Sequence, residues 1–436
     1  MKHTQKSSAT PAEAKEWDAG IVVGIDPGLD QHGVVALVAG SCYRLERRMF
    51  PNSIAGMQML AGRLQEWQHR GQGRLTIAIE EASAYGEALE CYLSQAGFQV
   101  VVVNELKVAR FKDAIGADAS DLDDAEAIAR FVMVQPDQAR TPARQAVQAD
   151  THGPVHRRLR QWSRRYERWT REHTATCNEL HAVLRMAWLA DYQRFFSRID
   201  GAAALAFWQQ YPTPVEVAAA DDQQIAALLR HASHGRLATK TCAARARDIR
   251  ETAVLMVAAF GRNDPNRWSA WAQDIRLLAG HLAYINAGRK QLEASIQEAL
   301  ESIGSPLPSF KGIGPILSAM IHGETLSIRR FGTADQFARY NGTAPREDSS
   351  GRQPRHVKNV RCNRRLRQAF MQLALNAPRY QVASRAYEKH LEARGITGGA
   401  ARIRLARRLS NIVFAMLRDN QPYDLELYMN KKKPAA

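Results

Sequence analysis

Two short apolar runs in the N-terminal part of the chain each end in a carboxylate. Asp26 closes the run at residues 21–25, and Glu80 closes the run at residues 75–79. Apolar runs of this length, bounded by turn residues, are typical of buried strands. A charged side chain that directly follows such a strand is held at the edge of the sheet, where it can reach solvent. The pattern therefore predicts a sheet with acidic side chains gathered at one edge.

A second pair of acids lies in a segment with helical spacing, residues 120–129. Asp121 and Asp124 are three residues apart, so they share one face of the expected helix. Together with Asp26 and Glu80 they form a set of four acids that can hold two Mg²⁺ ions roughly 4 Å apart. This is the usual arrangement for chemistry on phosphodiester bonds. We expect all four residues to be catalytic metal ligands.

Two neighbouring acids are alternatives for these positions. Glu81 follows Glu80 directly, and Asp123 lies between the two acids of the helix. Side chains alternate between the two faces of a strand, so only one of Glu80 and Glu81 can serve the same site.

The order of the expected elements predicts the fold of this part of the chain. Strands are expected at residues 21–26, 34–38, 43–50, 75–80 and 98–103, and helices at 54–67, 86–95 and 106–115, before the helical segment that carries Asp121 and Asp124. The order β-β-β-α-β-α-β-α, with acids on the first strand, the fourth strand and the final helix, predicts an α/β RNase H-like domain over residues 20–134.

The composition indicates which class of partner the chain binds and in which cellular compartment it is expected. A chain of 436 residues with 45% hydrophobic residues can form two or three domains, and its formal charge of +16 favours a polyanionic partner. It contains no apolar stretch long enough to span a bilayer, and residues 1–19 have the polar composition of a disordered lead-in. Its five cysteines include no Cys-x-x-Cys pair, which favours reduced thiols in a cytoplasmic protein over a zinc site.

A polar linker at residues 135–154 precedes a helical, coiled-coil region at residues 155–305. A long amphipathic stretch at 268–303 is expected to pair in antiparallel fashion with the helix that begins near residue 156. Trp162, Tyr166 and Trp169 recur with helical spacing, so this stripe packs against a partner helix or offers bases a surface for stacking. Both can hold together if the stripe faces inward and the arginines face outward. The same helix carries the arginines expected to bind nucleic-acid phosphates: Arg157, Arg158, Arg160, Arg164, Arg165 and Arg168, with Arg171 beyond them.

The last part of the chain, residues 306–420, is expected to be a mainly helical domain, followed by a basic tail at 421–436. The sequence Gly-Ile-Gly-Pro at residues 312–315 is similar to a helix-hairpin-helix turn, whose free amides can grip a phosphate. A loop at residues 342–351 contains Ser349 and Ser350. A basic helical stretch is expected directly after it, and its nucleic-acid-binding residues are Lys358, Arg361, Arg364, Arg365 and Arg367.

Taken in order, these motifs resemble the DEDD-type transposases of insertion sequences, recombinases guided by a bridge RNA. The N-terminal half matches in the strand-end Asp26, in Glu-Glu-Ala-Ser-Ala-Tyr at residues 80–85, and in Asp-x-x-Asp-Ala at 121–125. The C-terminal half matches in Gly-Ile-Gly-Pro, in Gly-x-x-Pro at 342–345, in Ser-Gly at 350–351 and in Arg-Leu-Arg at 365–367. The chain differs from the family at one motif: the family commonly has Lys-Thr-Asp, and this chain has Ala-Ser-Asp at residues 119–121.

The resemblance implies a RuvC-like N-terminal domain and a C-terminal transposase domain. It implies that Ser350 is the nucleophile that joins DNA, with Ser349 as the alternative, and the spacing to Tyr85 favours Glu80 over Glu81. It also implies Mg²⁺ and a structured non-coding guide RNA as cofactors. The implied partners are the DNA of the donor ends and target, and further copies of the chain in a dimer or tetramer associated with the nucleoid.

The sequence thus predicts an RNA-guided DNA recombinase that excises and inserts a mobile element. The alternative is a RuvC-like structure-selective endonuclease or Holliday-junction resolvase that uses water as its nucleophile. A third class, a binding protein without catalysis, is disfavoured by the order of the acids. The serine loop separates the first two classes, because a hydrolase needs no serine.

Overall fold

A computed structural model describes most of the chain in two compact units, residues 1–149 and 150–436. The residues described are 20–41, 43–72, 74–80, 84–103, 105–116, 118, 120–136, 150–260, 265–344, 346–348, 355–357 and 362–425. Within these residues, no helix is both long enough and apolar enough to cross a membrane.

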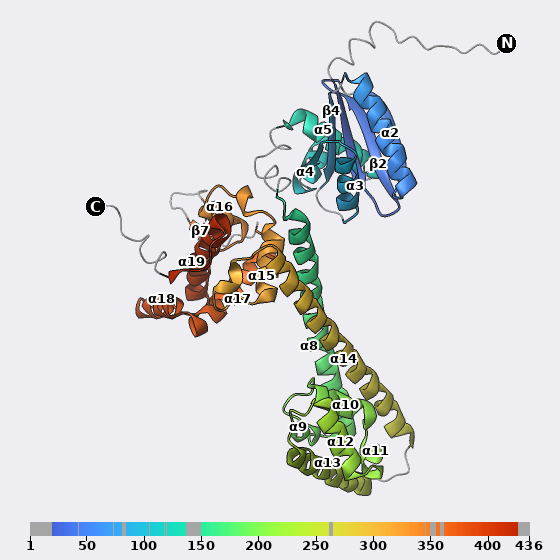
Figure 1. The fold of residues 1–436 in the computed structure, drawn as a ribbon, viewed down its shortest axis with the longest axis vertical. Coiled ribbons are helices and arrows are strands. Elements are labelled where there is room, and N and C mark those ends of the chain that lie inside the picture. The colour runs from blue at the N-terminus through green and yellow to red at the C-terminus, as the bar shows by residue number, and fades with distance from the viewer. Residues whose placement is uncertain are drawn as a thin grey trace, which may run out of the picture. The chain divides into compact units, whose positions relative to one another are not determined.

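The first unit is built on a five-stranded mixed sheet (Figure 1). The strand order is β3-β2-β1-β4-β5; β1 is antiparallel to β2 and parallel to β4, and β4 is parallel to β5. This is the RNase H-like arrangement that the element order predicts, and the expected fold class is confirmed. The elements are β1 (Ile21–Pro27), β2 (Gln31–Val38), β3 (Arg44–Pro51), α2 (Ile54–Arg70), β4 (Leu75–Glu80), α3 (Ala84–Gln95), β5 (Val100–Val103), α4 (Glu105–Ile115) and α5 (Asp121–Val134).

Helices cover both faces of this sheet, which explains why its central strands are almost continuously apolar. On one face, Val23 and Ile25 of β1 belong to a core shared with α2 and α3. On the other face, Val22 of β1 belongs to a core shared with α4 and α5, which includes Val108 and Ile128. The alternation along β1 therefore fixes which side chains point toward α5.

The second unit contains a long antiparallel helix pair, α8 (Gly153–Trp188) and α14 (Pro265–Ser302). Arg289 contacts Tyr166 while His281 contacts Glu172, so the two helices run in opposite directions, as expected from the sequence. Helix α8 begins at Gly153, two residues before the expected boundary. The reason is Pro154, which has no N–H to lose in the first turn and is well tolerated there.

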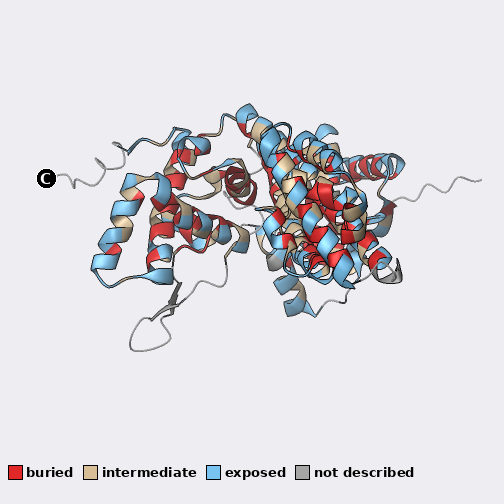
Figure 2. Cartoon of the chain, turned by 90° about the horizontal axis from the view of Figure 1, so that it is seen from below, coloured by how far each residue is buried: buried red, intermediate tan, exposed pale blue. Residues whose placement is uncertain are grey.

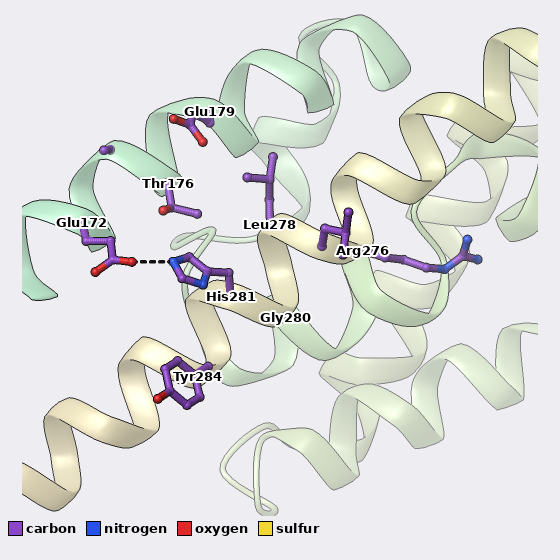
Figure 3. A pocket seen from close by; sticks show the side chains of 10 residues that line it. Glu172, Thr176, Glu179, Arg276, Leu278, Gly280, His281 and Tyr284 are labelled. Atoms are coloured by element: carbon purple, nitrogen blue, oxygen red, sulfur yellow. Dashed lines mark hydrogen bonds and ion pairs between the residues drawn. The ribbon is translucent and has the colours of Figure 1, made fainter.

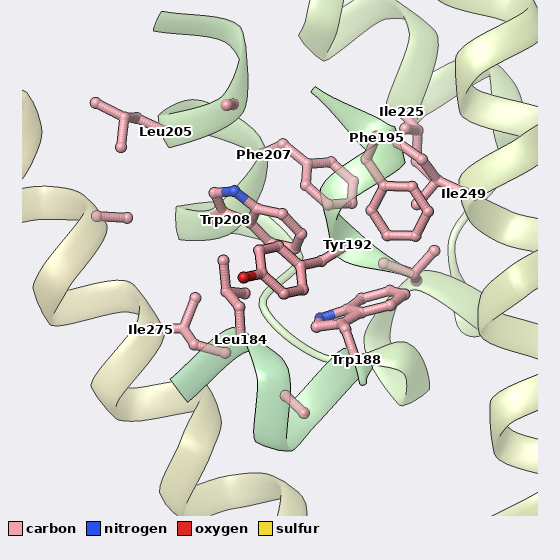
Figure 4. Packing of buried hydrophobic residues seen from close by; sticks show 14 of the residues in the cluster. Leu184, Trp188, Tyr192, Phe195, Leu205, Phe207, Trp208, Ile225, Ile249 and Ile275 are labelled. Carbon is pink, nitrogen blue, oxygen red and sulfur yellow. The ribbon is translucent and has the colours of Figure 1, made fainter. Parts of the chain in front are cut away.

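A small helical bundle lies between these two helices in the sequence and has its own aromatic core (Figure 4). Trp188, Phe195, Phe207 and Trp208 are fully buried, and the Trp188 indole N–H donates to the carbonyl of Pro212 at 2.7 Å. The helices are α9 (Tyr192–Phe195), α10 (Ala202–Gln210), α11 (Pro214–Ala219), α12 (Asp222–Ala232) and α13 (Thr239–Phe260).

The C-terminal part of the second unit is mainly helical, and buried and exposed residues alternate around its helices (Figure 2). Phe337, Phe370 and Phe414 pack together at its centre. Its elements are η1 (Leu307–Ser309), α15 (Pro315–Thr325), η2 (Ile328–Arg330), α16 (Ala334–Tyr340), β6 (Arg346–Asp348), β7 (Arg355–Val357), α17 (Arg364–Tyr380), α18 (Val382–Ala393) and α19 (Gly398–Asp419).

Two expectations for this region are corrected. The segment expected to be only a loop, residues 342–351, includes strand β6, which pairs in antiparallel fashion with β7. The expected basic helix begins at Arg364 rather than Lys358, because the Asn363 side chain caps it by accepting a hydrogen bond from the Leu366 N–H. Ser349, Ser350, Lys358 and Arg361 lie outside the described residues.

Candidate active site

Asp26 and Glu80 lie next to each other at one edge of the sheet. Strands β1 and β4 are parallel, and Ile25 stands opposite Ile79 in their register. The residues that follow, Asp26 and Glu80, are therefore neighbours at the carboxyl ends of the two strands. By alternation both point to the face of the sheet that α4 and α5 cover.

Two glycines allow α5 to lie directly on this face. A Cβ atom added at Gly24 would stand 2.0 Å from the Ala125 carbonyl oxygen, and one added at Gly33 would stand 2.4 Å from the Asp121 carbonyl oxygen. Gly33 is also the antiparallel partner of Asp26. The first turn of α5, which carries the second acid pair, is therefore held one strand away from Asp26.

The electrostatics of the first unit group the four expected acids into one cluster. Burial, followed by repulsion from Asp124 and Asp121, raises the pKa of Asp26 to about 6. Burial, followed by repulsion from Asp26, Glu105 and Asp124, raises the pKa of Glu80 to about 7. Such shifts arise where carboxylates are withdrawn from water and lie near other negative charges.

The donor set of this cluster suits a divalent cation. Carboxylate oxygens are hard ligands of the kind that Mg²⁺ prefers, and crowded carboxylates are stabilised when a cation lies among them. Among the residues described by the structure, no group of three or more Asp, Glu, His or Cys side chains is placed so that it could hold a metal ion. The acids are gathered on one face of the sheet.

Asp123, one of the two alternative acids, is engaged elsewhere. Its carboxylate is 2.7 Å from Arg47 Nη2 and also accepts a hydrogen bond from the Ser120 hydroxyl. These contacts, the Ser120 hydrogen bond first, lower the pKa of Asp123. Its contacts connect the start of α5 to β3. Glu81, the other alternative, lies outside the described residues.

Two residues of the cluster were missed by the sequence analysis, and both lie on α4. The Lys112 ammonium donates to an Asp124 carboxylate oxygen, and Glu105 repels Glu80. The sequence contains a pattern that could have identified both residues. Glu105 comes two residues after the last residue of β5, and Lys112 lies seven positions later, on the same helical face.

The aromatic stripe of α8 packs against its partner helix. Trp162, Tyr166 and Trp169 lie against the core between α8 and α14. The Trp169 ring fills the space above Gly288, where an added Cβ would stand 2.8 Å from it. Arg289 lies over the Tyr166 ring, 4.9 Å from its centroid. Of the two interpretations left open, packing describes the stripe.

The arginines of α8 divide into two groups. Arg158, Arg165 and Arg168 are exposed. Arg160 and Arg164, also expected to bind phosphates, instead face Glu324 of α15, with Arg164 Nε 2.8 Å and Arg160 Nε 3.6 Å from its carboxylate oxygens. Four further arginines expected to bind nucleic acid lie at the start of α17 or on α8. Arg365 pairs with Glu167 of α8, Arg364 is exposed, and Arg157 and Arg367 are half-buried.

Glu324 supports the base of the segment that contains the two candidate serines. Its side chain is 2% exposed, and Asn363 Nδ2 donates to it at 2.8 Å. Asn363 N–H in turn donates to the Tyr340 carbonyl at 2.8 Å, which ties the two ends of residues 340–363 together. Burial alone would raise the pKa of Glu324, but the hydrogen bonds from Arg164 and Asn363 outweigh it and lower the pKa.

Replacing Arg164 by methionine is expected to lower the free energy of unfolding by about 3 kcal/mol, because a buried carboxylate loses its bidentate partner. The lower end of the usual range applies, since Arg164 is 41% exposed and Arg160 remains nearby. Urea denaturation at neutral pH measures the loss. The matched control is Arg165→Met, an exposed neighbour, for which we expect a change below about 0.5 kcal/mol. Equal losses in both variants would contradict the role of this ion pair.

A groove between α8 and α14 belongs to the helix pair (Figure 3). Two of its ion pairs lie within the unit: His281 is 2.8 Å from Glu172, and Arg276 is 2.5 Å from Glu216 of α11. Leu277 and Tyr284 are exposed along its rim. The groove thus follows the seam of the helix pair and lies in the second unit, while the acid cluster lies in the first.

Two family profiles match this chain. One, described as a transposase of the DEDD type named after IS110, covers residues 23–189. The other, described as the transposase IS116/IS110/IS902 family, covers residues 304–389. The first match contains all four acids of the cluster, and the second contains Glu324, Asn363 and the candidate serines.

Curated relatives and solved structures are similar to parts or most of the chain. The IS110 43.6 kDa protein of Streptomyces coelicolor is 25% identical over 411 residues, which are 93% of this chain and 96% of the relative. The IS900 42 kDa protein of Mycobacterium paratuberculosis is 29% identical over 239 residues, 54% of this chain and 57% of the relative. RuvC of Thermus thermophilus is 20% identical, with a TM-score of 0.21 over 26% of this chain and 96% of RuvC.

Proposed function

We propose, from the premise that this chain belongs to the IS116/IS110/IS902 family of transposases, that it is a Mg²⁺-dependent DNA recombinase that excises and inserts an insertion sequence. The observation that carries this proposal is the cluster of Asp26, Glu80, Asp121 and Asp124 on one face of the RNase H-like sheet. Crowded carboxylates at a sheet edge are suited to phosphodiester chemistry.

The four acids would hold the metal ions, most simply two of them. When bound, Mg²⁺ neutralises the charge of the phosphate and makes its phosphorus easier to attack. The chain supplies the positions: Asp26 and Glu80 come from adjacent strand ends, and α5 brings Asp121 and Asp124 over them. The glycines at 24 and 33 let α5 lie directly on this face of the sheet, which supports a shared role of both pairs at one phosphate.

The attacking group in this proposal is the hydroxyl of Ser350. Its oxygen forms a bond to the phosphorus of one DNA phosphodiester and gives up its proton. The phosphorus–oxygen bond to the leaving strand end breaks, and that end takes a proton to become a hydroxyl. Because the phosphoserine keeps an ester bond, a second strand end can attack it later without an input of ATP.

Guidance by a bridge RNA and assembly into a dimer or tetramer belong to the same proposal. The formal charge of +16 suits a chain that holds both RNA and DNA. The exposed arginines of α8 are surface cations suited to phosphate contacts. Target choice would then rest on base pairing by the RNA, with the protein contacting mainly the backbone.

The test is a reaction of the full chain with its guide RNA and labelled DNA carrying the ends of the element. We expect a protease-sensitive protein–DNA adduct on a denaturing gel when Mg²⁺ is present, and none in EDTA. Free cleaved ends without any adduct would replace this proposal by the endonuclease or resolvase that uses water. Absence of both products with the complete set of partners would contradict a recombinase.

The exposed arginines of α8 carry a separate prediction. Reversing the charge of Arg158, Arg165 and Arg168 to glutamate should lower the slope of log affinity against log salt by about 2 to 3, close to 0.9 for each lost phosphate contact. Filter binding of the guide RNA and of duplex DNA between 50 and 200 mM salt measures the slope. Arg185→Glu, another exposed arginine of α8, is the control. An unchanged slope in the triple variant would make these arginines a solvated helix face.

A further inference from the structure

One cation already lies among the acids of the first unit. Lys112 reaches from α4 to a carboxylate oxygen of Asp124, the last acid of the cluster. Its side chain is only 19% exposed, whereas the Asp124 side chain is 37% exposed. The charge of Lys112 also acts on Asp26 and Glu80, where it opposes the rise in their pKa. This lysine therefore contacts one acid of the cluster, Asp124, and its charge also acts on two others, Asp26 and Glu80.

We propose that Lys112 is the resident counter-cation of the acid cluster, which must leave Asp124 when Mg²⁺ binds and then contacts a phosphate oxygen of the DNA. This inference rests on the proposed metal-dependent function and adds to it a residue that sets metal affinity and holds the substrate.

The chemistry of lysine suits both proposed contacts, the one with Asp124 and the one with a DNA phosphate. An ammonium group is a compact charge on a flexible four-carbon chain, so it can exchange one oxygen partner for another without movement of the backbone. The Asp124 oxygen that it occupies is unavailable to a metal ion until the contact breaks. If Asp124 held a metal ion, the Lys112 ammonium would be released from it and could bind a phosphate oxygen, a common partner of lysine.

The packing of α4 against α5 does not by itself explain this contact. The two helices are joined by an apolar interface in which Phe111 lies against Phe131, with ring centroids 5.7 Å apart. Val108 is buried in the same core. If Lys112 served only to join the two helices, it could pair with another acid of α5. One such acid, Asp123, is paired with Arg47 instead. Lys112 lies with the acid that belongs to the cluster.

The test compares wild type with Lys112→Met, which keeps the length of the side chain and removes its charge. Calorimetric titration of the full chain with Mg²⁺ should give a dissociation constant lowered about threefold to tenfold, the scale of a partly exposed ion pair. Strand cleavage at saturating Mg²⁺ should fall at least about tenfold, because a phosphate contact is lost. Lys112→Arg keeps the charge, so we expect metal affinity near that of wild type and partial cleavage. Lys107→Met, on the same helix, is the matched control.

The outcomes separate this inference from the function on which it rests. A dissociation constant for Mg²⁺ that is the same in Lys112→Met and wild type overturns the inference and leaves the metal site intact. Tighter Mg²⁺ binding with unchanged cleavage also overturns it, because the phosphate contact is then absent. If wild type and Asp26→Asn bind Mg²⁺ equally, the acid cluster is not a metal site, and the proposed function fails first.

Discussion

Replacing Asp26 by asparagine is expected to abolish strand cleavage and strand transfer, with a loss of at least about 10³-fold, while binding of RNA and DNA stays within about twofold of wild type. A bound metal contributes several kcal/mol to such a reaction, and each 1.36 kcal/mol is a factor of ten in rate. Asp26 sits at the centre of the cluster, since it stands beside Glu80 and repels, or is repelled by, every other acid of the set.

Asparagine keeps the shape of the side chain and its carbonyl oxygen but removes the charge, so the variant separates metal binding from folding. Removing one of several crowded charges relieves repulsion, and we expect the thermal midpoint without metal to stay the same or to rise. Asp123→Asn is the control, because Asp123 is bound to Arg47 and Ser120 outside the cluster. Full cleavage by Asp26→Asn in Mg²⁺ would remove the cluster from the mechanism, as would equal losses in both variants.

The parts of this site that the sequence predicts are those with a local signal. Asp26 and Glu80 directly follow apolar runs. Once β1 and β4 pair in parallel, their register places the two acids side by side at the strand ends. Asp121 and Asp124 share a helical face whatever the helix packs on. The close approach of this helix to the sheet depends on Gly24 and Gly33. A glycine in a strand can serve several structural purposes, so the sequence alone does not indicate that these two admit a helix.

The contacts that were not predicted join residues far apart in the chain. The partner of Arg164 is Glu324, 160 residues away, and no periodicity links the two. A row of arginines beside aromatic residues looks the same in sequence whether it faces a buried acid or a phosphate. Lys112 illustrates the same limit, because its helix was expected but its orientation depends on how Phe111 and Val108 pack.

Replacing Ser350 by alanine is expected to eliminate the protein–DNA adduct, with a loss of at least about 10³-fold, the scale observed when an enzyme loses its nucleophile. In the sequence, Ser350 comes two residues after the end of β6, between Tyr340 and Asn363, whose backbone groups are hydrogen-bonded to each other. Assembly with RNA and DNA should be unaffected, because a hydroxyl contributes little to a phosphate-binding surface of arginines and lysines. Denaturing gels of reactions on labelled DNA measure the adduct.

Ser349→Ala is the matched control, since it changes the neighbouring hydroxyl in the same segment. Loss of the adduct in Ser349→Ala alone would move the nucleophile by one residue and leave the mechanism unchanged. Retention of the adduct in the double variant would exclude both serines. Because Ser350→Ala keeps the four acids, any hydrolysis that remains in it measures how far the acid cluster can cut DNA with water.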